Sequence, residues 1–565
     1  MLSIKEIGGI GRKYRHVMRY RQILGIIFRY GFGNIIDALN IEQYIEVGLN
    51  LISRTREEKI EKLSGNERIR MIFEELGPTF IKLGQIISSR PDLVPVDLVH
   101  ELSKLQDKVH PFEYEQVEAI IVSEFGKPCK DVFNTMEKIP LASASIGQVH
   151  KATLKNGKGV VVKIQRPGIK KIIEIDLQII HHLASLMETH VKEVALHKPV
   201  RIVEEFAKTI GKELDYSIEA TSMQRIADQF KDDSTIHIPM VYTDQSTSKV
   251  LTMEYIQGIK ISEIEEIDKA GFDRKIITRR GADFIMKQVF ENGFFQADPH
   301  PGNIFVTEGN VISPVDFGMT GFVTRTAREF FVELLHSIAI GNTRLLTRLL
   351  FELTEYDKRP NFESLERELS DFLAMYTSKP LKDIKTSAMI NQGLEICGQY
   401  GIKVPPDFFL MIKAFVAVEG IAKKLDPDFN LILHATPYVK AVKMKKYSPS
   451  RIAENVGEIV TDSFKLMKFF PSDILELIRA AKQGKINLNL KLTGLDKILE
   501  THDQTSNRIA FAIIIASLII GSAQLIDSNV PPVVFGVSLI GIVGFLAAAM
   551  MGVWLLFAII KKGRL

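Results

Sequence analysis

The residues best suited to chemistry lie in two short polar segments near the middle of the chain. In the first, QADPHPGNIF, Asp298 is followed by Asn303, and in the second, VISPVDFGMTG, Asp316 precedes Phe317 and Gly318. Because Mg²⁺ prefers oxygen ligands, we predict that Asn303 and Asp316 hold a metal ion. Asp298 is suited to orienting an attacking hydroxyl or water and accepting its proton. Together these segments predict phosphoryl transfer, in which bound Mg²⁺ neutralises the charge of the transferred group.

A lysine in an apolar strand supplies the next functional group. Residues 159–164, GVVVKI, are predicted to form a buried strand that contains Lys163. An unpaired ammonium in that position would be costly, so Lys163 needs anionic partners. We predict that residues 204–220 form a helix whose Glu219 is one partner, and that nucleotide phosphates are the other. The lysine strand, the Asp-x4-Asn segment and the DFG segment follow one another in the order found in protein kinases.

Two further segments are predicted to contact a nucleotide. Residues 251–258, LTMEYIQG, resemble a kinase hinge, so the backbone from Glu254 to Ile256 is expected to meet adenine. Kinases cover the phosphates with a GxGxxG loop before the lysine strand, but this chain has PLASASIGQV there, with a single glycine. The phosphates must therefore be held differently, and the preference between ATP and ADP stays open. The residues expected to contact the nucleotide in this loop are Ala142, Ser143, Ala144, Ser145, Ile146, Gly147 and Val149.

These motifs resemble those of the UbiB/ADCK (AarF) family of atypical kinases, whose members carry an alanine-rich loop of this form. The segment LGPTFIKLGQIISSRPDLVP at 76–95 is similar to the family's KxGQ segment and contains Lys82 and Gln85. The segment KELDYSIEA at 212–220 is similar to its ExD segment and contains Glu213 and Asp215. FFQADPHPGN, VDFGMTG and the SNVPP turn also match, so the likeness extends from about residue 25 to the C-terminus.

The resemblance implies an α+β, two-lobed protein-kinase-like fold with an N-terminal helical extension. It implies that Lys82 and Gln85 lie on a helix folded across the active site, where Glu213 and Asp215 hold it and protein substrates are blocked. The implied activity is Mg²⁺-dependent binding and hydrolysis of ATP that supports isoprenoid-quinone (ubiquinone-type) biosynthesis at a membrane. Three positions depart from the family pattern. Ser143 replaces an alanine, Gln296 stands where many members have histidine, and Ser222 where many have asparagine.

The residues of the KxGQ segment themselves predict an amphipathic helix. Pro78 suits a first helical turn, and Lys82 and Gln85 share one face. Gly84 costs about 1 kcal/mol relative to alanine inside a helix, which suggests that another backbone packs close to it. A surface helix with an ordinary lysine is the alternative. The apolar face of the helix would be formed by Phe80, Leu83 and Ile87.

Two long apolar runs near the C-terminus predict a transmembrane hairpin. Residues 509–526 and 533–560 carry no charge, and each run is long enough to cross a bilayer as a helix. Basic residues stand only at the outer ends, Arg508 before the first run and Lys561 after the second, so both ends are predicted to be cytoplasmic. The predicted location is the cell membrane, with the catalytic body in the cytoplasm, and a buried soluble hairpin is the alternative. Small residues at every fourth position would let the helices pack closely, namely Ala512, Ala516, Ser517, Gly521, Gly544, Ala548 and Gly552.

Length and charge limit what the whole chain can be. Its 565 residues exceed what one hydrophobic core holds. The 72 Lys and Arg against 68 Asp and Glu leave a net charge of +4, which argues against nucleic acid as a partner. Cys129 and Cys397 are isolated and expected to be buried thiols. Residues 12–30, with Arg12, Arg15 and Arg19, predict a basic helix that is either solvated or interfacial.

We predict five parts along the chain. They are a helical extension with the KxGQ helix (1–135), an N-lobe (136–258), a C-lobe (259–445), a membrane-proximal connector (446–507) and the transmembrane hairpin (508–565). Membrane lipid, quinone precursors and quinone-biosynthesis proteins are the expected partners, and the oligomeric state stays open. Two other functions also stay open: phosphate transfer to a small molecule or protein, and a lipid-binding scaffold that uses nucleotide only to change shape.

Overall fold

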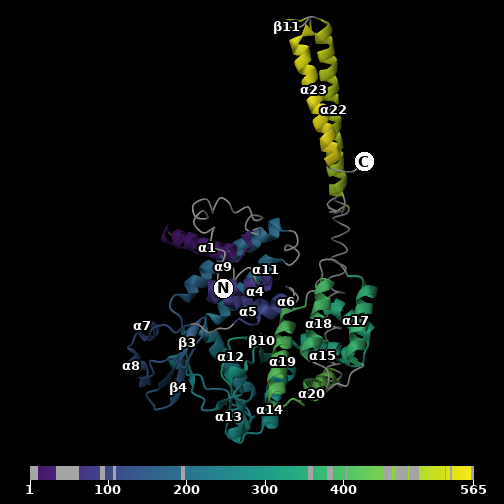
Figure 1. Cartoon of the computed structure of the whole chain (residues 1–565). Coiled ribbons are helices and arrows are strands. Elements are labelled where there is room, and N and C mark those ends of the chain that lie inside the picture. The colour runs from purple at the N-terminus through teal and green to yellow at the C-terminus, as the bar shows by residue number, and fades with distance from the viewer. Residues whose placement is uncertain are drawn as a thin grey trace. The chain divides into compact units, whose positions relative to one another are not determined.

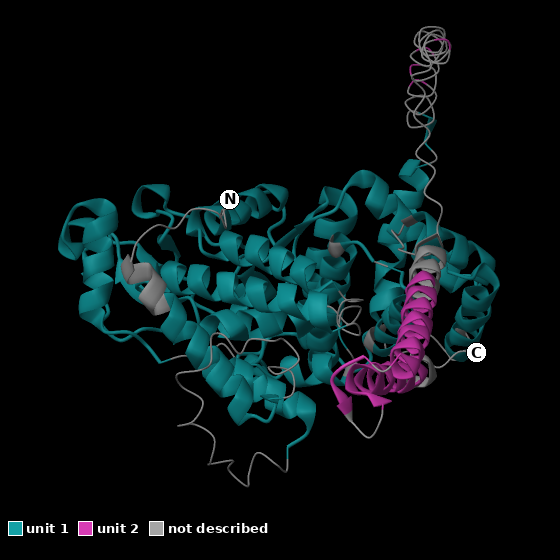
Figure 2. Ribbon diagram, turned by 90° about the horizontal axis from the view of Figure 1, so that it is seen from above, with its two compact units in different colours: residues 1–454 teal, residues 455–565 magenta. Residues whose placement is uncertain are grey.

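The computed structural model divides the chain into two compact units, residues 1–454 and 455–565, which are considered separately (Figure 2). The described residues are 10–33, 63–88, 94, 96–105, 110–191, 198–353, 360–377, 386–402, 404–446, 448–449, 457, 461, 464, 482, 495–528, 530–534 and 537–561. Most of the predicted connector, 446–507, lies outside them. The other predicted boundaries stay predictions.

A small antiparallel sheet holds Lys163. Its strands are β1 (Thr135–Met136), β2 (Ala142–Ser143), β3 (Gly147–Thr153), β4 (Gly159–Gln165) and β5 (Val250–Glu254), in the order β1–β3–β4–β5 with β2 paired to β3. Side chains alternate between the two faces of a strand. Val160, Val162 and Ile164 of β4 therefore enter a core with α7 (Tyr114–Phe125) and α8 (Cys129–Val132), and Lys163 lies on the opposite face.

Further helices precede and follow the lysine strand in the sequence (Figure 1). They are α1 (Ile10–Arg29), α4 (Gly65–Leu76), α5 (Pro78–Ser88), α6 (Val96–Leu102), α9 (Ile169–His190), α11 (Pro199–Glu213) and α12 (Tyr216–Gln229). Val161, on the same face of β4 as Lys163, belongs to one large core with buried residues of α5, α9, α11 and α12. The sheet and the helical extension therefore share their packing.

The single helix predicted over 204–220 is wrong, because α11 ends at Glu213 and α12 begins at Tyr216. Between them Asp215 has extended backbone angles, φ −123° and ψ 97°. Its carboxylate accepts a hydrogen bond from the N–H of Ser217, as an N-cap does. The cap ends one helix and starts the next in its own direction, which brings Glu219 to Lys163.

A buried carboxylate anchors the helical extension to the body of unit 1. Asp176 of α9 is 0% exposed and accepts two hydrogen bonds from Arg19 of α1, at 2.7 and 3.0 Å. Thr79 of α5 donates to the same carboxylate at 2.6 Å, and Arg19 also donates to the carbonyl of Leu76 at 2.7 Å. Within the predicted basic face, Arg19 is therefore a structural ion pair, and neither solvated nor lipid-facing. The side chains of Arg12 and Arg15 lie outside the described residues.

The second half of unit 1 is mostly helical. Its strands are β6 (Ile259–Lys260), β7 (Phe294–Gln296), β8 (Ile304–Thr307), β9 (Val311–Pro314) and β10 (Thr320–Phe322), which form a β6–β8–β9 sheet and a β7–β10 pair. Asn303 stands directly before β8 and Asp316 shortly after β9. Because β8 and β9 are antiparallel, the two residues meet at the same end of the hairpin.

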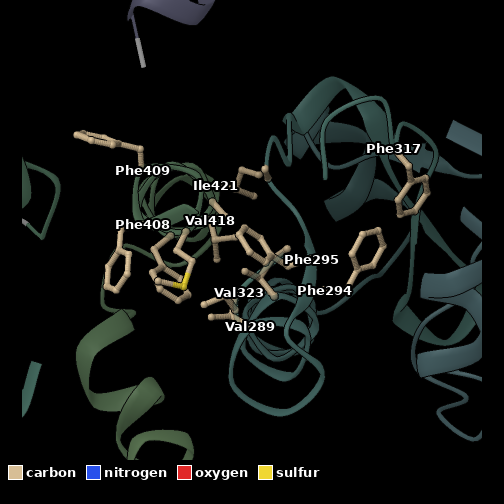
Figure 3. Packing of buried hydrophobic residues seen from close by; sticks show 14 of the residues in the cluster. Val289, Phe294, Phe295, Phe317, Val323, Phe408, Phe409, Val418 and Ile421 are labelled. Atoms are coloured by element: carbon tan, nitrogen blue, oxygen red, sulfur yellow. The ribbon is translucent and has the colours of Figure 1, made fainter. Parts of the chain in front are cut away.

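The helices of this half are α13 (Ile264–Lys269), α14 (Arg274–Met286), α15 (Arg325–Ala339), α16 (Thr343–Leu353), α17 (Phe362–Thr377), α18 (Thr386–Gln399), α19 (Pro406–Leu425) and α20 (Leu431–Lys446), with a π-helical segment η4 (Lys287–Asn292) after α14. Figure 3 shows Val418 and Ile421 of α19 packed toward Phe295 of β7. Phe317 is 1% exposed and its ring lies next to Phe294. Helix α19 thus forms a fixed wall beside the segments that carry Asp298 and Asp316.

Unit 2 is a hairpin of two long helices, α22 (Leu495–Asp527) and α23 (Leu539–Lys561). Within them Ser506–Asp527 and Leu539–Leu556 are long and apolar enough to cross a membrane. The second helix begins later than the predicted span 533–560, because β11 (Val533–Val534) and β12 (Val537–Ser538) pair as a short antiparallel ladder before it.

Small residues bring α22 and α23 together, but only some of the predicted ones take part. A side chain at the predicted Gly544 would meet the Ser522 hydroxyl. Gly541, which was not predicted, also faces α22, where a side chain would meet the side chain of Ile526 and the backbone of Ile526 and Ser522. Gly521 and Gly552 instead face open space. Spacing alone identifies small residues on a helix but does not say which of them face the partner helix.

We expect Asp176→Asn to loosen α1 and α5 together. The change removes the negative charge that holds Arg19, and breaking a buried pair costs on the order of 3 kcal/mol. Hydrogen exchange followed by mass spectrometry should then show faster exchange in residues 10–33 and 65–88. Arg29→Met is the matched control, because the Arg29–Glu75 pair is exposed and such pairs contribute about 1 kcal/mol or less. Unchanged exchange in both helices of Asp176→Asn would contradict the anchoring role of Asp176.

We expect Gly541→Ala to weaken the hairpin and Gly552→Ala to leave it intact or strengthen it. Both changes improve helix propensity by about 1 kcal/mol, but only the methyl group at position 541 collides with the facing helix, at the side chain and backbone of Ile526. Trp554 is the single tryptophan of the chain, and the centroid of its ring lies 5.9 Å from that of Phe511 in the other helix. Its fluorescence during a titration with SDS in mixed micelles therefore reports separation of the helices. Equal midpoints for the two variants would rule out the close contact at Gly541.

Candidate functional site

The lysine predicted to need an anionic partner has one. The ammonium of Lys163 in β4 lies 2.8 and 3.0 Å from the two carboxylate oxygens of Glu219 in α12. The side chain of Glu219 is 6% exposed and that of Lys163 is 18% exposed. The N–H of Phe317 also donates to Glu219, at 3.5 Å. One buried ion pair therefore joins the sheet, α12 and the DFG segment.

The charges of this group support one another. Burial lowers the pKa of Lys163, but the carboxylates of Glu219 and Asp316 outweigh it and leave the pKa raised. Burial raises the pKa of Asp316, but the charge of Lys163 outweighs it and leaves the pKa lowered. Burial also keeps the pKa of Glu219 above its ordinary value, although Lys163 acts against this. Lys163 and Asp316 are therefore both charged near neutral pH, as phosphate and metal binding require.

The two predicted metal ligands lie side by side. The amide of Asn303 donates to Asp316 at 2.9 Å, and the N–H of Gly318 donates to the other carboxylate oxygen of Asp316 at 3.0 Å. Gln296, one of the positions that depart from the family pattern, is buried and donates to the Asp316 carbonyl at 2.6 Å. No cluster of three His, Cys, Asp or Glu that could hold a metal occurs among the described residues. An Asp and an Asn suit Mg²⁺, which binds through few protein ligands together with substrate phosphates.

Asp298, the predicted catalytic carboxylate, is joined by a residue that the motifs do not include. Lys413 of α19 lies 3.0 Å from Asp298 and donates to the sulfur of Met319 at 3.6 Å. A lysine inside the apolar run FFLMIKAFVAV is a signal that the sequence offers, because a cation on such a helix needs a partner. The sequence does not say which partner it is.

The loop predicted to cover the phosphates is a tight hairpin between β2 and β3. The N–H of Ala144 donates to the carbonyl of Gly147 at 2.8 Å. Ser145 is 0% exposed, and within the described structure the hydroxyls of Ser143 and Ser145 have no hydrogen-bond partner. Unpaired buried hydroxyls are costly, and phosphate oxygens would satisfy them. The residues present therefore fit a nucleotide. The remaining predicted loop residues, Ala142, Ile146 and Val149, lie on the same hairpin.

The hinge segment is already partly engaged within the protein. The N–H of Glu254 donates to Met240 and the N–H of Tyr255 donates to Gly159, at 2.9 and 3.2 Å. The Glu254 carboxylate lies 3.0 Å from His237, and Ile256 is buried. These bonds fix the strand end, and adenine contact with the backbone from Glu254 to Ile256 stays a prediction.

The KxGQ helix is α5, and it reaches the site. Lys82 lies 3.4 Å from Glu213, and its charge helps to lower the pKa of Asp316. Gln85 donates to the carbonyl of Leu105 at 3.4 Å. Asp215, expected to hold this helix, instead caps α12 through the N–H and hydroxyl of Ser217. Of the two ExD carboxylates, Glu213 therefore contacts α5 and Asp215 caps α12.

Gly84 corrects a second expectation about α5. Its close neighbours are the side chains of Leu105 and Phe73, at 2.3 and 2.8 Å from an added Cβ atom, and not another backbone. The predicted apolar face packs inward, since Phe80 and Leu83 are buried. Gly84 thus lets α5 sit flat on its neighbours, which holds Lys82 at the site.

Comparison with known proteins finds the same combination of parts. Residues 104–350 match the ABC1 atypical kinase-like domain, 369–430 the UbiB helical domain and 493–561 the ABC1/UbiB kinase-like C-terminal domain. An uncharacterized protein in the hydrogenase 1 5′ region of Clostridium pasteurianum is 32% identical over 97% of this chain and 100% of its own. The probable protein kinase UbiB of Marinobacter nauticus is 34% identical over 70% of this chain and 73% of its own. That of Aliivibrio salmonicida is 30% identical over 91% and 94%.

These matches confirm the predicted α+β, kinase-like fold with an apolar C-terminal hairpin. They also place the protein in the kinase and ATPase class of enzymes, with a domain of the nucleotide-binding, kinase-like type. The roles of single site residues stay predictions, although the structure brings most of them together. The chain belongs to the UbiB/ADCK family of atypical kinases.

Proposed function

We propose that this protein is a membrane-anchored, Mg²⁺-dependent ATPase that supports isoprenoid-quinone (ubiquinone-type) biosynthesis. The observation that carries the proposal is the buried Lys163–Glu219 pair beside the adjoining Asp316 and Asn303. A structural ion pair alone would not need an adjacent Asp–Asn pair suited to a metal ion. A lipid-binding scaffold would not need it either, so the geometry favours an enzyme over a scaffold.

Each residue has a separate task in this proposal. Lys163 binds the nucleotide phosphates, and Glu219 holds its ammonium in place. Asn303 and Asp316 hold Mg²⁺, which when bound neutralises charge on the phosphate oxygens. Asp298 orients the attacking oxygen and accepts its proton. Lys413 holds the Asp298 carboxylate from α19, so that the carboxylate faces the nucleotide with one fixed geometry.

The KxGQ helix supports hydrolysis over transfer to a protein. Lys82 is paired with Glu213, and its charge also reaches Asp316, which supports a position for α5 beside the metal-binding residues. The anchor at Asp176 keeps α5 there. In this proposal α5 leaves access for a water molecule and excludes a protein segment. Transfer to a small molecule is the second outcome that turnover experiments have to distinguish.

The membrane and quinone parts of the proposal rest on the C-terminal hairpin and on family likeness. Two helices are long and apolar enough to span a bilayer, and the second ends in Lys561, which argues for a cytoplasmic body at the cell membrane. Membrane lipid would then be a constant partner, and membrane-embedded quinone precursors and quinone-biosynthesis proteins are the proposed clients.

We expect reconstituted protein to release phosphate from ATP with Mg²⁺, and Asp316→Asn to slow this release by roughly 100-fold or more, since it removes a metal-binding charge. The measurement is phosphate release in liposomes. Asp268→Asn is the control, because Asp268 is exposed and pairs with Arg274 far from the site in sequence. Lys82→Ala should increase phosphate incorporated into protein, because it frees α5 from Glu213. An intact protein that binds ATP and never hydrolyses or transfers it would favour the scaffold.

We expect Lys413→Met to lower kcat for ATP turnover by roughly tenfold to 100-fold, with KM for ATP nearly unchanged, because Asp298 loses its orientation and the nucleotide contacts stay. Lys413→Arg should restore part of the activity, since it retains a cation. Lys423→Met is the matched control, a lysine of the same helix paired with Glu419 at 3.1 Å. A loss in KM, or an equal loss in Lys423→Met, would mean that Lys413 acts on folding and not on Asp298.

A further inference from the structure

The hydroxyl of Tyr216 is buried at the centre of the site and has no role in the proposal above. Tyr216 is the first residue of α12 and is 1% exposed. Its hydroxyl has no hydrogen-bond partner within the described structure. A buried donor without a partner destabilises a protein. Such a group is retained where something outside the chain satisfies it, so its surroundings indicate what that is.

The surroundings of Tyr216 are those of a phosphate site. The ammonium of Lys163 lies over its ring, 5.1 Å from the centroid. Its hydroxyl faces Gly147, where an added Cβ atom would lie 2.3 Å from that oxygen. Burial raises the pKa of Tyr216, and the charges of Glu219 and Asp316 add to this against the opposing charge of Lys163. The hydroxyl therefore keeps its proton and can donate a hydrogen bond to an anion.

The hairpin above this hydroxyl carries donors of the same kind. Gly147 begins β3 and ends the turn that contains Ser145, whose buried hydroxyl is also unpaired, as is that of Ser143. A glycine-rich loop holds phosphates with backbone N–H groups. In this turn the N–H of Ala144 is already bonded to Gly147. The serine hydroxyls therefore offer donors beside a backbone N–H that is already bonded.

We propose that the Tyr216 hydroxyl is a phosphate donor of the nucleotide site, reached when the 142–149 hairpin lifts to admit the polyphosphate of a nucleoside di- or triphosphate. The inference rests on the proposed function and adds a residue that lies outside the loop and the lysine strand. Tyr216 follows Asp215, which starts α12, and precedes Glu219 on the same helix. One short helix end would thus supply both the partner of Lys163 and a direct contact to phosphate.

The test is Tyr216→Phe in the full chain, and its readouts are thermal unfolding and ligand affinity, neither of which depends on catalytic activity. Because the change removes an unpaired buried group, thermal unfolding without nucleotide should shift upward by about a few degrees or stay equal. Affinity for Mg²⁺–ADP and Mg²⁺–ATP should fall by roughly tenfold or more. Inorganic pyrophosphate should show the same loss, because the contact is to phosphate. Adenosine without phosphates should show no change.

Tyr376→Phe is the control, because the Tyr376 hydroxyl already has a partner in the protein. It donates a hydrogen bond to Gln392, over 3.0 Å. It should lower the unfolding temperature and leave nucleotide affinity unchanged. Tyr216→Phe with a lower unfolding temperature and unchanged affinity would overturn the inference, because the hydroxyl would then be bonded inside the protein. Intact protein that binds nucleotide without turnover refutes the proposed activity alone, and the affinity comparison still decides on Tyr216. Intact protein that binds neither nucleotide nor pyrophosphate refutes both.

Discussion

A cation buried on one strand determines how the parts of the site come together. Lys163 stands in an apolar stretch of β4, where an ammonium is tolerated only with carboxylates beside it. Glu219 and Asp316 supply them from α12 and from the segment after β9. The demand for charge compensation therefore ties the sheet to the two segments that carry the metal and phosphate chemistry. Removing Lys163 would leave the buried carboxylates of Glu219 and Asp316 without the cation that they share.

The same constraint places the helical extension. Asp176 is fully buried and is satisfied by Arg19 and Thr79, from two helices of the extension. If α5 moved away, the Asp176 carboxylate would lose the hydrogen bond from Thr79. That bond therefore helps to keep α5 in place, with Lys82 beside Glu213. The extension is thus held by two charge pairs, Arg19 with Asp176 and Lys82 with Glu213. Both contacts tie α5 to the rest of unit 1, which is the arrangement that the proposed control of access by this helix requires.

The hydroxyl groups of the site follow a different rule from its charges. The buried charges are paired, whereas the hydroxyls of Ser143, Ser145 and Tyr216 lack partners within the described structure. Unsatisfied donors raise the free energy of the nucleotide-free state, and a bound phosphate would lower it. A site built in this way gains affinity from groups that are already in place. Its stability and its nucleotide affinity are then opposed, as is common at functional sites.

The amino-acid sequence by itself determined which chemistry is present and that two apolar helices follow, because the types and order of Lys163, Asp298, Asn303 and Asp316 and the uncharged runs are local properties. It also identified Glu219 correctly while placing it on the wrong helix. The break at Asp215, the pairing of Lys413 with Asp298 and the identity of the glycines that face Ser522 required the tertiary structure. Arg19 and Asp176, 157 positions apart, show the reason. Which faces meet depends on the direction in which each helix leaves its neighbours, and that direction is set by packing between distant segments.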